Sequence, residues 1–212
     1  MVIAIDGPAG AGKSTVAQGV AKALGFTYLD SGAMYRCVAL AAKDRGIDVE
    51  DGERLGELAW SLDIGFDGGS IRLDGDPVEG RIRSPEVTIA ASHVSVHPQV
   101  RQAMVKRQRE LIAASNFVAE GRDIGTVVSP ESPLKIFLTA DEEERARRRA
   151  ADSGESVNKV QEDMRDRDRR DQDRADSPLR AADDSVSVDT TDLSAEQVVG
   201  RIAELARERG LA

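Results

Sequence analysis

The chain has 212 residues, 40% of them hydrophobic and 32% charged, and its formal net charge at pH 7 is −9. This length suits a single well-buried domain with a small insertion. The negative charge excludes non-specific attraction to nucleic acid or to an anionic membrane surface, so neither is an expected partner.

Targeting and redox signals are few in this chain. The single cysteine, Cys37, excludes an intramolecular disulfide, and His93 and His97 match no metal-binding spacing. The opening MVIAIDG has no basic stretch, so we expect no signal peptide, and no run approaches the roughly 20 apolar residues that span a bilayer. These features predict a cytoplasmic protein.

The first part of the chain alternates between strand and helix patterns. Short apolar runs at residues 2–6 and 26–30 predict strands. Apolar residues at helical spacing predict helices over 13–25, ending at Gly25, and over 31–46. This alternation is typical of an α/β fold, in which a parallel sheet carries helices on its faces.

The middle of the chain has a different pattern. Residues 62–84 contain short runs separated by glycine, which predict small antiparallel strands. Because this stretch is too small to bury its own core, we expect an insertion within one domain over 1–212. A helix is predicted from about Pro98 to Ala114. Its apolar stripe consists of Val100, Met104, Leu111 and Ile112.

Further strands and helices follow. Buried strands are predicted at residues 117–121, 134–140 and 185–191. A helix opens at Asp141, which can cap it, and Glu144 fits a capping box there. Ser194 and Gln197 form a second capping box, which predicts a C-terminal helix.

The stretch GPAGAGKS at residues 7–14 fits the phosphate-binding pattern G-x-x-x-x-G-K-[ST] in full. Its glycines let successive backbone N–H groups point at phosphate oxygens, and the helix that follows presents its positive end to the same anion. We expect Lys13 to contact the β- and γ-phosphates and Ser14 to offer its hydroxyl to Mg²⁺. The predicted ATP-binding residues are Gly7, Ala9, Gly10, Ala11, Gly12, Lys13, Ser14 and Thr15.

A phosphate-binding loop alone leaves the class of protein open. A GTPase switch needs NKxD and DxxG motifs, but the nearest stretch, NKVQ at residues 158–161, lacks the aspartate, and DxxG does not occur. An ATP-driven motor is expected to be larger. A small-molecule kinase remains, and it needs a second anion-binding site for the phosphoryl acceptor.

Three stretches can supply that second site. LDSGAMYR at residues 29–36 and AEGRDIGT at 119–126 each follow a predicted strand. They therefore lie at the carboxyl edge, where ligands of open α/β sheets bind. The third stretch is RDRDRRDQDR at 165–174.

Each stretch also has an ordinary structural explanation. Ser31 can be a helix cap, Arg122 and Asp123 a surface ion pair, and the run at 165–174 a solvated helix face. The joint occurrence of all three after a phosphate-binding loop favours a functional role.

The arginine run has two faces if it is helical. Arg167, Asp171 and Arg174 are then spaced i, i+4 and i+7 and share one face, whereas Arg169 lies on nearly the opposite side. We therefore expect one face to enter the active site and the other to be solvated.

These stretches, together with IDGPAGAGKST and PLKIFLTAD, closely resemble in their order the bacterial cytidylate kinases, a family of nucleoside monophosphate kinases. The resemblance covers nearly the whole chain. It implies a parallel five-stranded sheet in the order 2-3-1-4-5 with helices on both faces, a monophosphate-binding β insertion at about 62–84 and a mobile lid at about 148–163. It also implies transfer of the γ-phosphoryl group of ATP to CMP or dCMP with Mg²⁺, in pyrimidine nucleotide metabolism.

The resemblance assigns the acceptor site residue by residue. The residues that would face cytosine are Ser31, Arg101 and Asp123. Those that would hold phosphate are Arg36, Arg122 and Arg174. Those that would lie near the ribose are Ser92, Arg167 and Asp171, and Tyr35 would belong to the same pocket. The catalytic residues would be Lys13, Arg122 and Arg174. Some family members have aspartate where this chain has Glu120.

The residue types suit this acceptor on physical grounds. The amino group and ring nitrogen of cytosine need an acceptor and a donor, which aspartate and arginine provide, and uracil reverses one of these positions. The planar fork of arginine binds two phosphate oxygens at once. The alternative is a related kinase acting on UMP or another small acceptor, with a nucleotide-binding switch further behind. A monomer is expected, because no large exposed apolar helix face is left over.

Overall fold

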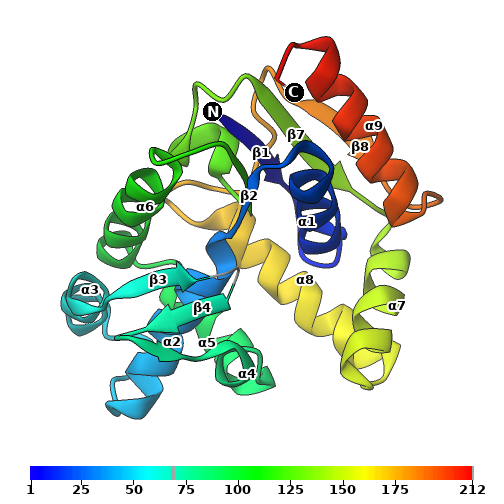
Figure 1. The fold of residues 1–212 in the computed structure, drawn as a ribbon. Helices are drawn as coiled ribbons and strands as arrows, with labels where there is room; N and C mark the ends of the chain where they lie inside the picture. The colour runs from blue at the N-terminus through cyan, green and yellow to red at the C-terminus, as the bar shows by residue number, and fades with distance from the viewer. Residues whose placement is uncertain (68–69, 212) are drawn as a thin grey trace. The chain divides into compact units, whose positions relative to one another are not determined.

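The computed structural model describes residues 1–67 and 70–211, and its main sheet has five strands in the order β2-β6-β1-β7-β8 (Figure 1). These strands are β1 (Val2–Asp6), β2 (Thr27–Asp30), β6 (Phe117–Gly121), β7 (Leu134–Thr139) and β8 (Val186–Asp189). β1 pairs in parallel with both β6 and β7, and β7 pairs in parallel with β8. Numbered along the chain, the strand order is 2-3-1-4-5, so the predicted parallel sheet is confirmed.

The chain divides into two compact units, which are described separately. The first comprises Met1–Leu29 and Ile112–Ala212, and the second comprises Asp30–Leu111. The first unit contains four whole strands of the main sheet and most of β2. The second contains the small antiparallel sheet.

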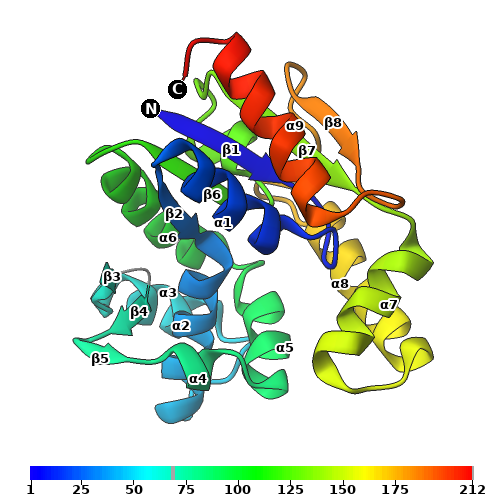
Figure 2. The same ribbon diagram turned by 45° about the vertical axis from the view of Figure 1, so that its right-hand side comes forward.

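The core of the first unit lies between the main sheet and two helices. α1 (Lys13–Leu24) and α9 (Ala195–Glu208) pack against each other on one face of the sheet (Figure 2). Every residue of β1 is buried, as expected for a central strand of a parallel sheet. The side chains that form this core include Ile3, Ile5, Val16, Val20, Leu134, Ile136, Val198 and Ile202.

The ends of these helices follow the predicted signals in most places. Gly25 ends α1 with a left-handed φ of 68°. Ser194 and Gln197 form the capping box of α9.

The predicted cap of α7 (Glu142–Ser153) is wrong. Asp141 stands at the N-cap position, but within the part of the chain that the structure describes its side chain bonds to no N–H of the first turn. The Glu144 carboxylate pairs with Arg147 and Arg148 instead of reaching back to the cap. The local ion pairs therefore replace the capping box.

α8 (Val157–Asp173) packs against α7, and the two form a helical hairpin. The run at 165–174 belongs to α8, with Arg174 as its C-cap residue. A single π-helical turn, η1 (Ile124–Val128), follows β6. Among the residues described, no helix combines the length and apolar character needed to cross a membrane.

The second unit joins helices to a small sheet. Its strands β3 (Ile64–Asp67), β4 (Ser70–Leu73) and β5 (Asp76–Pro77) pair antiparallel in that order. The predicted strands within 62–84 are thus confirmed, although residues 68–69 of this stretch lie outside the described residues. The helices of the unit are α2 (Ser31–Asp44), α3 (Gly52–Ser61), α4 (Glu79–Ile82), α5 (Pro85–Val94) and α6 (Pro98–Ile112).

The helices α3, α4 and α5 were not predicted, and α4 lies within the stretch 62–84 where strands were expected. α3 and α5 carry caps that the sequence contains: the Asp51 side chain accepts from the N–H of Arg54, and Ser84 accepts from the N–H of Val87. Pro85 at the first position of α5 is a further start signal. α6 ends at Ile112, two residues before the predicted end.

Candidate active site

The phosphate-binding loop connects β1 to α1. Gly10 and Gly12 have left-handed φ values of 74° and 82°, which glycine adopts without strain. A Cβ on Gly7 would lie 2.3 Å from the carbonyl oxygen of Leu138 on β7, so this position has no room for a side chain. Ala9 and Ala11 are buried, while Ser14 and Thr15 are exposed in the first turn of α1. The loop and the positive end of α1 form an arrangement that binds phosphate.

Lys13 is buried directly behind this loop. Its Nζ donates to the carbonyl oxygen of Pro8 at 2.7 Å. Burial, followed by repulsion from Arg122 and Arg167, lowers the pKa of Lys13 to about 7. A lysine with a pKa near neutrality gains positive charge when a negative group comes close to it.

Asp6, the last residue of β1, links the phosphate-binding loop to the turn that follows the neighbouring strand β6. Its carboxylate accepts from the N–H groups of Ile124 at 2.9 Å and Gly125 at 2.8 Å. Burial raises the pKa of Asp6 to about 6 despite these hydrogen bonds. The turn after β6 is therefore fixed to the end of β1. Sequence analysis did not single out Asp6, although a carboxylate at the carboxyl end of a central strand was a visible signal.

Half-buried Arg122, just after β6, forms an ion pair with buried Asp171 on α8. Arg122 Nε donates to Asp171 Oδ2 at 2.8 Å. Burial alone would lower the pKa of Arg122, but the Asp171 carboxylate outweighs it and raises that pKa. Burial would likewise raise the pKa of Asp171, but Arg122, Arg167 and Arg174 hold it below its usual value. Both side chains are therefore charged.

Arg174 joins the same cluster. Its guanidinium lies 3.8 Å from Asp123 and 3.9 Å from Asp171, and its Nε donates to the carbonyl oxygen of Ser177 at 2.6 Å. Asp123 and Arg174 are both buried. The interpretation of Arg122 and Asp123 as a surface ion pair is therefore wrong: each pairs with a buried partner from the region of α8.

The arginine run has two different faces in the structure. Asp171 is buried and Arg167 is half-buried. Arg169 has 70% of its side chain exposed and pairs with Asp166 on the same helix. The interpretation of the whole run as a solvated face is therefore wrong, because one side of α8 carries the buried cluster.

In the second unit, Asp30 organises the start of α2. Its Oδ1 accepts from the N–H of Ala33 at 2.8 Å, and its Oδ2 accepts from Arg36 Nη2 at 2.7 Å. Asp30 is therefore the helix cap, which corrects the interpretation of Ser31 as the cap. Ser31 is the buried first residue of the helix.

Arg101 on α6 is only 1% exposed. Its Nη1 donates to the carbonyl oxygen of Ser95 at 3.3 Å, and its guanidinium lies 5.7 Å from the centre of the Tyr35 ring. This distance is within the range of a cation–π contact. Ser92 on α5 is also buried. The second unit thus holds five of the predicted site residues: Ser31, Tyr35, Arg36, Ser92 and Arg101.

Glu120 is buried on β6 and accepts a short hydrogen bond from the hydroxyl of Tyr28 on β2. Its charge favours the protonated form of Lys13. This carboxylate therefore acts on the loop lysine through space, as part of the same buried group of charges.

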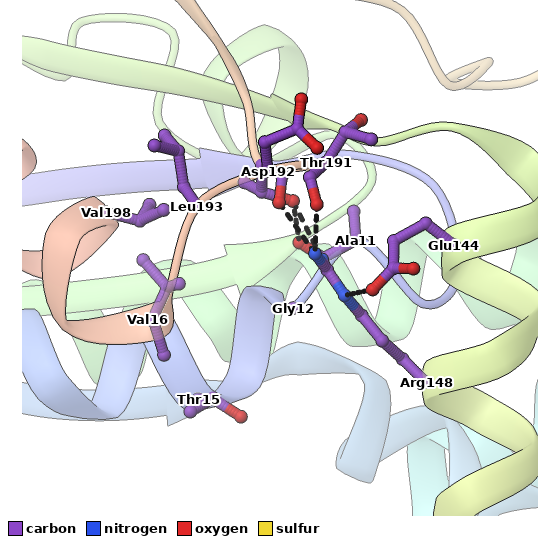
Figure 3. A pocket seen from close by; sticks show the side chains of 12 residues that line it. Ala11, Gly12, Thr15, Val16, Glu144, Arg148, Thr191, Asp192, Leu193 and Val198 are labelled. Atoms are coloured by element: carbon purple, nitrogen blue, oxygen red, sulfur yellow. Dashed lines mark hydrogen bonds and ion pairs between the residues drawn. The ribbon is translucent and has the colours of Figure 1, made fainter.

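A cavity of about 450 Å³ opens beside the phosphate-binding loop (Figure 3). Arg148 extends from α7 across the cavity. Its guanidinium donates to Thr190 Oγ1 at 3.0 Å and to the carbonyl oxygens of Thr190 at 2.6 Å and Thr191 at 3.2 Å. Glu144 holds the Nε of Arg148 at 3.0 Å. The other lining residues are Ala11, Gly12, Thr15, Val16, Asp192, Leu193, Ala195 and Val198.

Sequence analysis missed this cavity, because its walls come from parts of the chain that are distant in sequence. Its lining combines apolar and polar side chains, and its volume lies within the range of small-molecule sites.

The loop also fits a metal ion bound with a nucleotide. Among the described residues, no three His, Cys, Asp or Glu side chains cluster as a metal site. Mg²⁺ in phosphate-transfer sites, however, is held by one or two protein ligands together with phosphate oxygens and water. The exposed hydroxyl of Ser14, next to the loop, suits that role.

The fold and the loop define the class of protein as a P-loop kinase. A shikimate kinase from Acinetobacter baumannii, solved with shikimate, has a similar fold, with a TM-score of 0.50 and 17% sequence identity. The alignment covers 100% of this chain and 95% of that one. At this identity the likeness concerns the fold.

The sequence profile of the family described as cytidylate kinase matches residues 3–208. A cytidylate kinase of Caldanaerobacter subterraneus subsp. tengcongensis is 48% identical, over 97% of this chain and 94% of that protein. One of Solibacter usitatus is 47% identical, over 99% and 93%. The chain belongs to the cytidylate kinase family, which is a family of nucleoside monophosphate kinases.

Proposed function

We propose that the chain transfers the γ-phosphoryl group of ATP to CMP and dCMP, in pyrimidine nucleotide metabolism. The observation that supports this most is the charge cluster of Arg122, Asp171 and Arg174, because the charges of Arg122 and Asp171 reach Lys13 of the phosphate-binding loop. A switch or motor needs no second anion-binding site for a phosphoryl acceptor. A kinase that binds two nucleotides next to each other must neutralise the negative charge of both, and arginines in the site serve that purpose.

The donor site consists of the loop and the cavity beside it. Backbone N–H groups of the loop and Lys13 would bind the phosphates of ATP, and Ser14 would be the protein ligand of Mg²⁺, which offsets phosphate charge when bound. The cavity has the volume of a small-molecule site, and we assign it to the adenine ring. Arg148, which already lies along its wall, would face the ring.

The transfer step requires charge stabilisation more than proton transfer. The phosphate of CMP is ionised at neutral pH, so no general base is needed to activate it. Lys13, Arg122 and Arg174 are the residues that we assign to the charge on the transferred group. The Lys13 ammonium group would exchange its hydrogen bond to the Pro8 carbonyl oxygen for a contact with phosphate.

Acceptor recognition is proposed for the remaining residues. Asp123 would accept from the amino group of cytosine, and its buried position makes an unpaired group there costly. Ser31 and Arg101 are assigned to the base, Arg36 to the phosphate, and Ser92, Arg167 and Asp171 to the ribose, with Tyr35 in the same pocket.

The helical hairpin of α7 and α8 contains the segment proposed as the lid, at about 148–163. Gly154 ends α7 with a left-handed φ of 72°, which places a sharp turn inside this segment. Closing such a lid would keep water from becoming the phosphoryl acceptor. We also propose that the enzyme acts as a monomer in the cytoplasm, without nucleic acid or membrane partners.

An acceptor panel tests the proposed function. ADP release in a coupled assay with CMP, dCMP, UMP and AMP should be fastest with the two cytidine nucleotides. Asp123→Ala should weaken CMP use and reduce the preference for CMP over UMP by about tenfold or more, because the acceptor for the amino group is lost. Equal rates with CMP and UMP in the unmodified enzyme would contradict the proposal, as would turnover that no acceptor stimulates.

A further inference from the structure

Ala9 in the phosphate-binding loop is held by an ion pair from the helical hairpin. Its N–H donates to Asp168 Oδ1 at 3.2 Å, and its carbonyl oxygen accepts from Arg145 Nη1 at 2.9 Å. Arg145 Nη1 also donates to Asp168 Oδ2 at 2.6 Å. Each of the two charged residues is only 9% exposed. One buried pair therefore binds both polar groups of a single loop residue.

Apolar contacts seal this arrangement. Ala9 clusters with Ala150 on α7 and with Val160 and Met164 on α8. At the next loop residue, Gly10, a Cβ would lie 2.8 Å from Met164 Cε and 3.0 Å from the carbonyl oxygen of Arg145. The loop thus rests directly on the hairpin, and its backbone has little freedom at these two positions.

Arg145 also contacts the end of the strand β7. Its Nε donates to the carbonyl oxygen of Ala140, just after β7, at 3.2 Å. Arg145 on α7 precedes the proposed lid at about 148–163, and Asp168 on α8 follows it. The ion pair therefore ties both ends of that segment to the loop.

The negative charge of Asp168 and the positive charge of Arg145 have opposite effects on a triphosphate bound in the loop. A carboxylate that binds an N–H of a phosphate-binding loop places negative charge where phosphate must bind. Arg145 cancels that charge at 2.6 Å. If Arg145 lost its charge, the buried Asp168 carboxylate would remain uncompensated and would repel the triphosphate.

We infer that Arg145 and Asp168 are positioning residues for ATP. The pair orients the Ala9 peptide so that the loop N–H groups after it face phosphate, and Arg145 screens ATP from the Asp168 carboxylate. This inference rests on the proposed function, because it concerns the same nucleotide site.

The two residues should respond unequally to substitution. Arg145→Gln should weaken ATP binding by about tenfold or more, because it leaves a bare carboxylate beside the loop. Asp168→Asn removes that carboxylate and should weaken ATP binding less, by about threefold. The double variant Arg145→Gln/Asp168→Asn should bind ATP more tightly than Arg145→Gln alone. A purely structural contact would instead make the two single variants equivalent and the double variant no better.

The measurement is calorimetric titration of each full-length variant with ATP and, separately, with CMP, together with melting curves. Asp166→Asn is the matched control on α8, because Asp166 pairs only with exposed Arg169 among the contacts described and should leave the ATP dissociation constant unchanged. The CMP dissociation constant should change less than about threefold in all variants.

Arg145→Gln with ATP affinity like that of the unmodified enzyme, a double variant no better than Arg145→Gln, or an equal loss of CMP binding would each overturn the inference. If Arg145→Gln does not fold, Arg145→Lys decides the question: it keeps the positive charge that screens ATP from Asp168 and should stay within about threefold in ATP affinity, and a tenfold loss would overturn the inference. Failure of the proposed function is distinguishable, since the unmodified enzyme would then fail to bind ATP or to phosphorylate CMP.

Discussion

Lys13 and Asp6 are buried ionisable groups whose pKa values are shifted toward neutrality. Burial is the largest cause in both: it lowers the pKa of Lys13 to about 7 and raises that of Asp6 to about 6. For Lys13 the unfolded chain keeps its proton up to about 10.5, so it binds more protons than the folded chain between pH 7 and 10.5. This residue therefore makes the nucleotide-free protein more stable as the pH rises through that window. Because its pKa is close to neutrality, we expect Lys13 to gain positive charge when phosphate binds next to it.

ATP binding should therefore take up a proton at Lys13. At pH 8 the lysine of the free enzyme is mostly neutral, and the bound triphosphate should restore its charge, giving an uptake of about 0.5 to 1 proton. The phosphates of ATP contribute little at this pH, because their own pKa lies near 6. At pH 6 Lys13 is already charged and its uptake should vanish. The measurement is calorimetric titration with ATP in several buffers. The number of protons taken up is the slope of the binding enthalpy plotted against the ionisation enthalpy of the buffer.

Two variants control this measurement. Lys13→Arg keeps a charge that does not titrate, so the uptake at pH 8 should disappear while ATP still binds. Lys22→Gln, at an exposed position on the same helix, should retain it. An uptake that persists in Lys13→Arg would assign the proton to another group.

At the scale of the element, α8 divides its charges between two faces. Asp171 and the C-cap residue Arg174 belong to the buried cluster, whereas Arg169 and Asp166 pair in solvent. The helix ends at Asp173, and Arg174 has an extended backbone with φ −60° and ψ 137°. The spacing of the sequence thus predicts the buried face, while the exact place where the helix stops comes from the structure.

Substitutions on the two faces should differ sharply. Arg174→Lys keeps the charge but loses the bidentate fork, so turnover should fall by about 10²-fold or more, because arginines that stabilise the transferring phosphoryl group are worth about 10³–10⁵ in rate. Arg169→Lys should stay within about twofold, since exposed substitutions cost less than about 0.5 kcal/mol. Steady-state turnover at saturating ATP and CMP, with melting curves to confirm folding, measures both. Equal small effects would show that α8 makes no catalytic contribution through Arg174.

Elements that depend on local patterns were predictable, and contacts between distant residues were not. The capping box of α9 and the helix after the phosphate-binding loop follow from neighbouring residues alone. The contact of Arg145 with Asp168 joins two residues that are 23 positions apart, and the cavity beside the loop has walls from three regions. The cap predicted at Asp141 failed because Glu144 has stronger local partners in Arg147 and Arg148.

At the scale of the whole molecule, the alternation of strands and helices was enough to predict a parallel main sheet, whereas the strand order came from the family resemblance. The buried strands are short apolar runs, and parallel pairing follows from the helices between them. The second unit was predicted less completely, because α3 and α5 start from caps, Asp51 and Ser84, that only the structure singled out. The ATP-binding residues could be named from one motif, whereas the acceptor residues came from a resemblance that covered the chain.

The central claim is that the γ-phosphoryl group of ATP moves to CMP, and following that group tests it most directly. The enzyme would be incubated with ATP labelled in the γ-phosphate and with CMP, and the labelled products would be separated. We predict that the label appears in CDP, at a rate that depends on CMP, and that Lys13→Ala loses this transfer while keeping its fold, because Lys13 serves phosphate rather than the core. Label released only as inorganic phosphate, or transfer at the normal rate by the folded Lys13→Ala variant, would contradict the account.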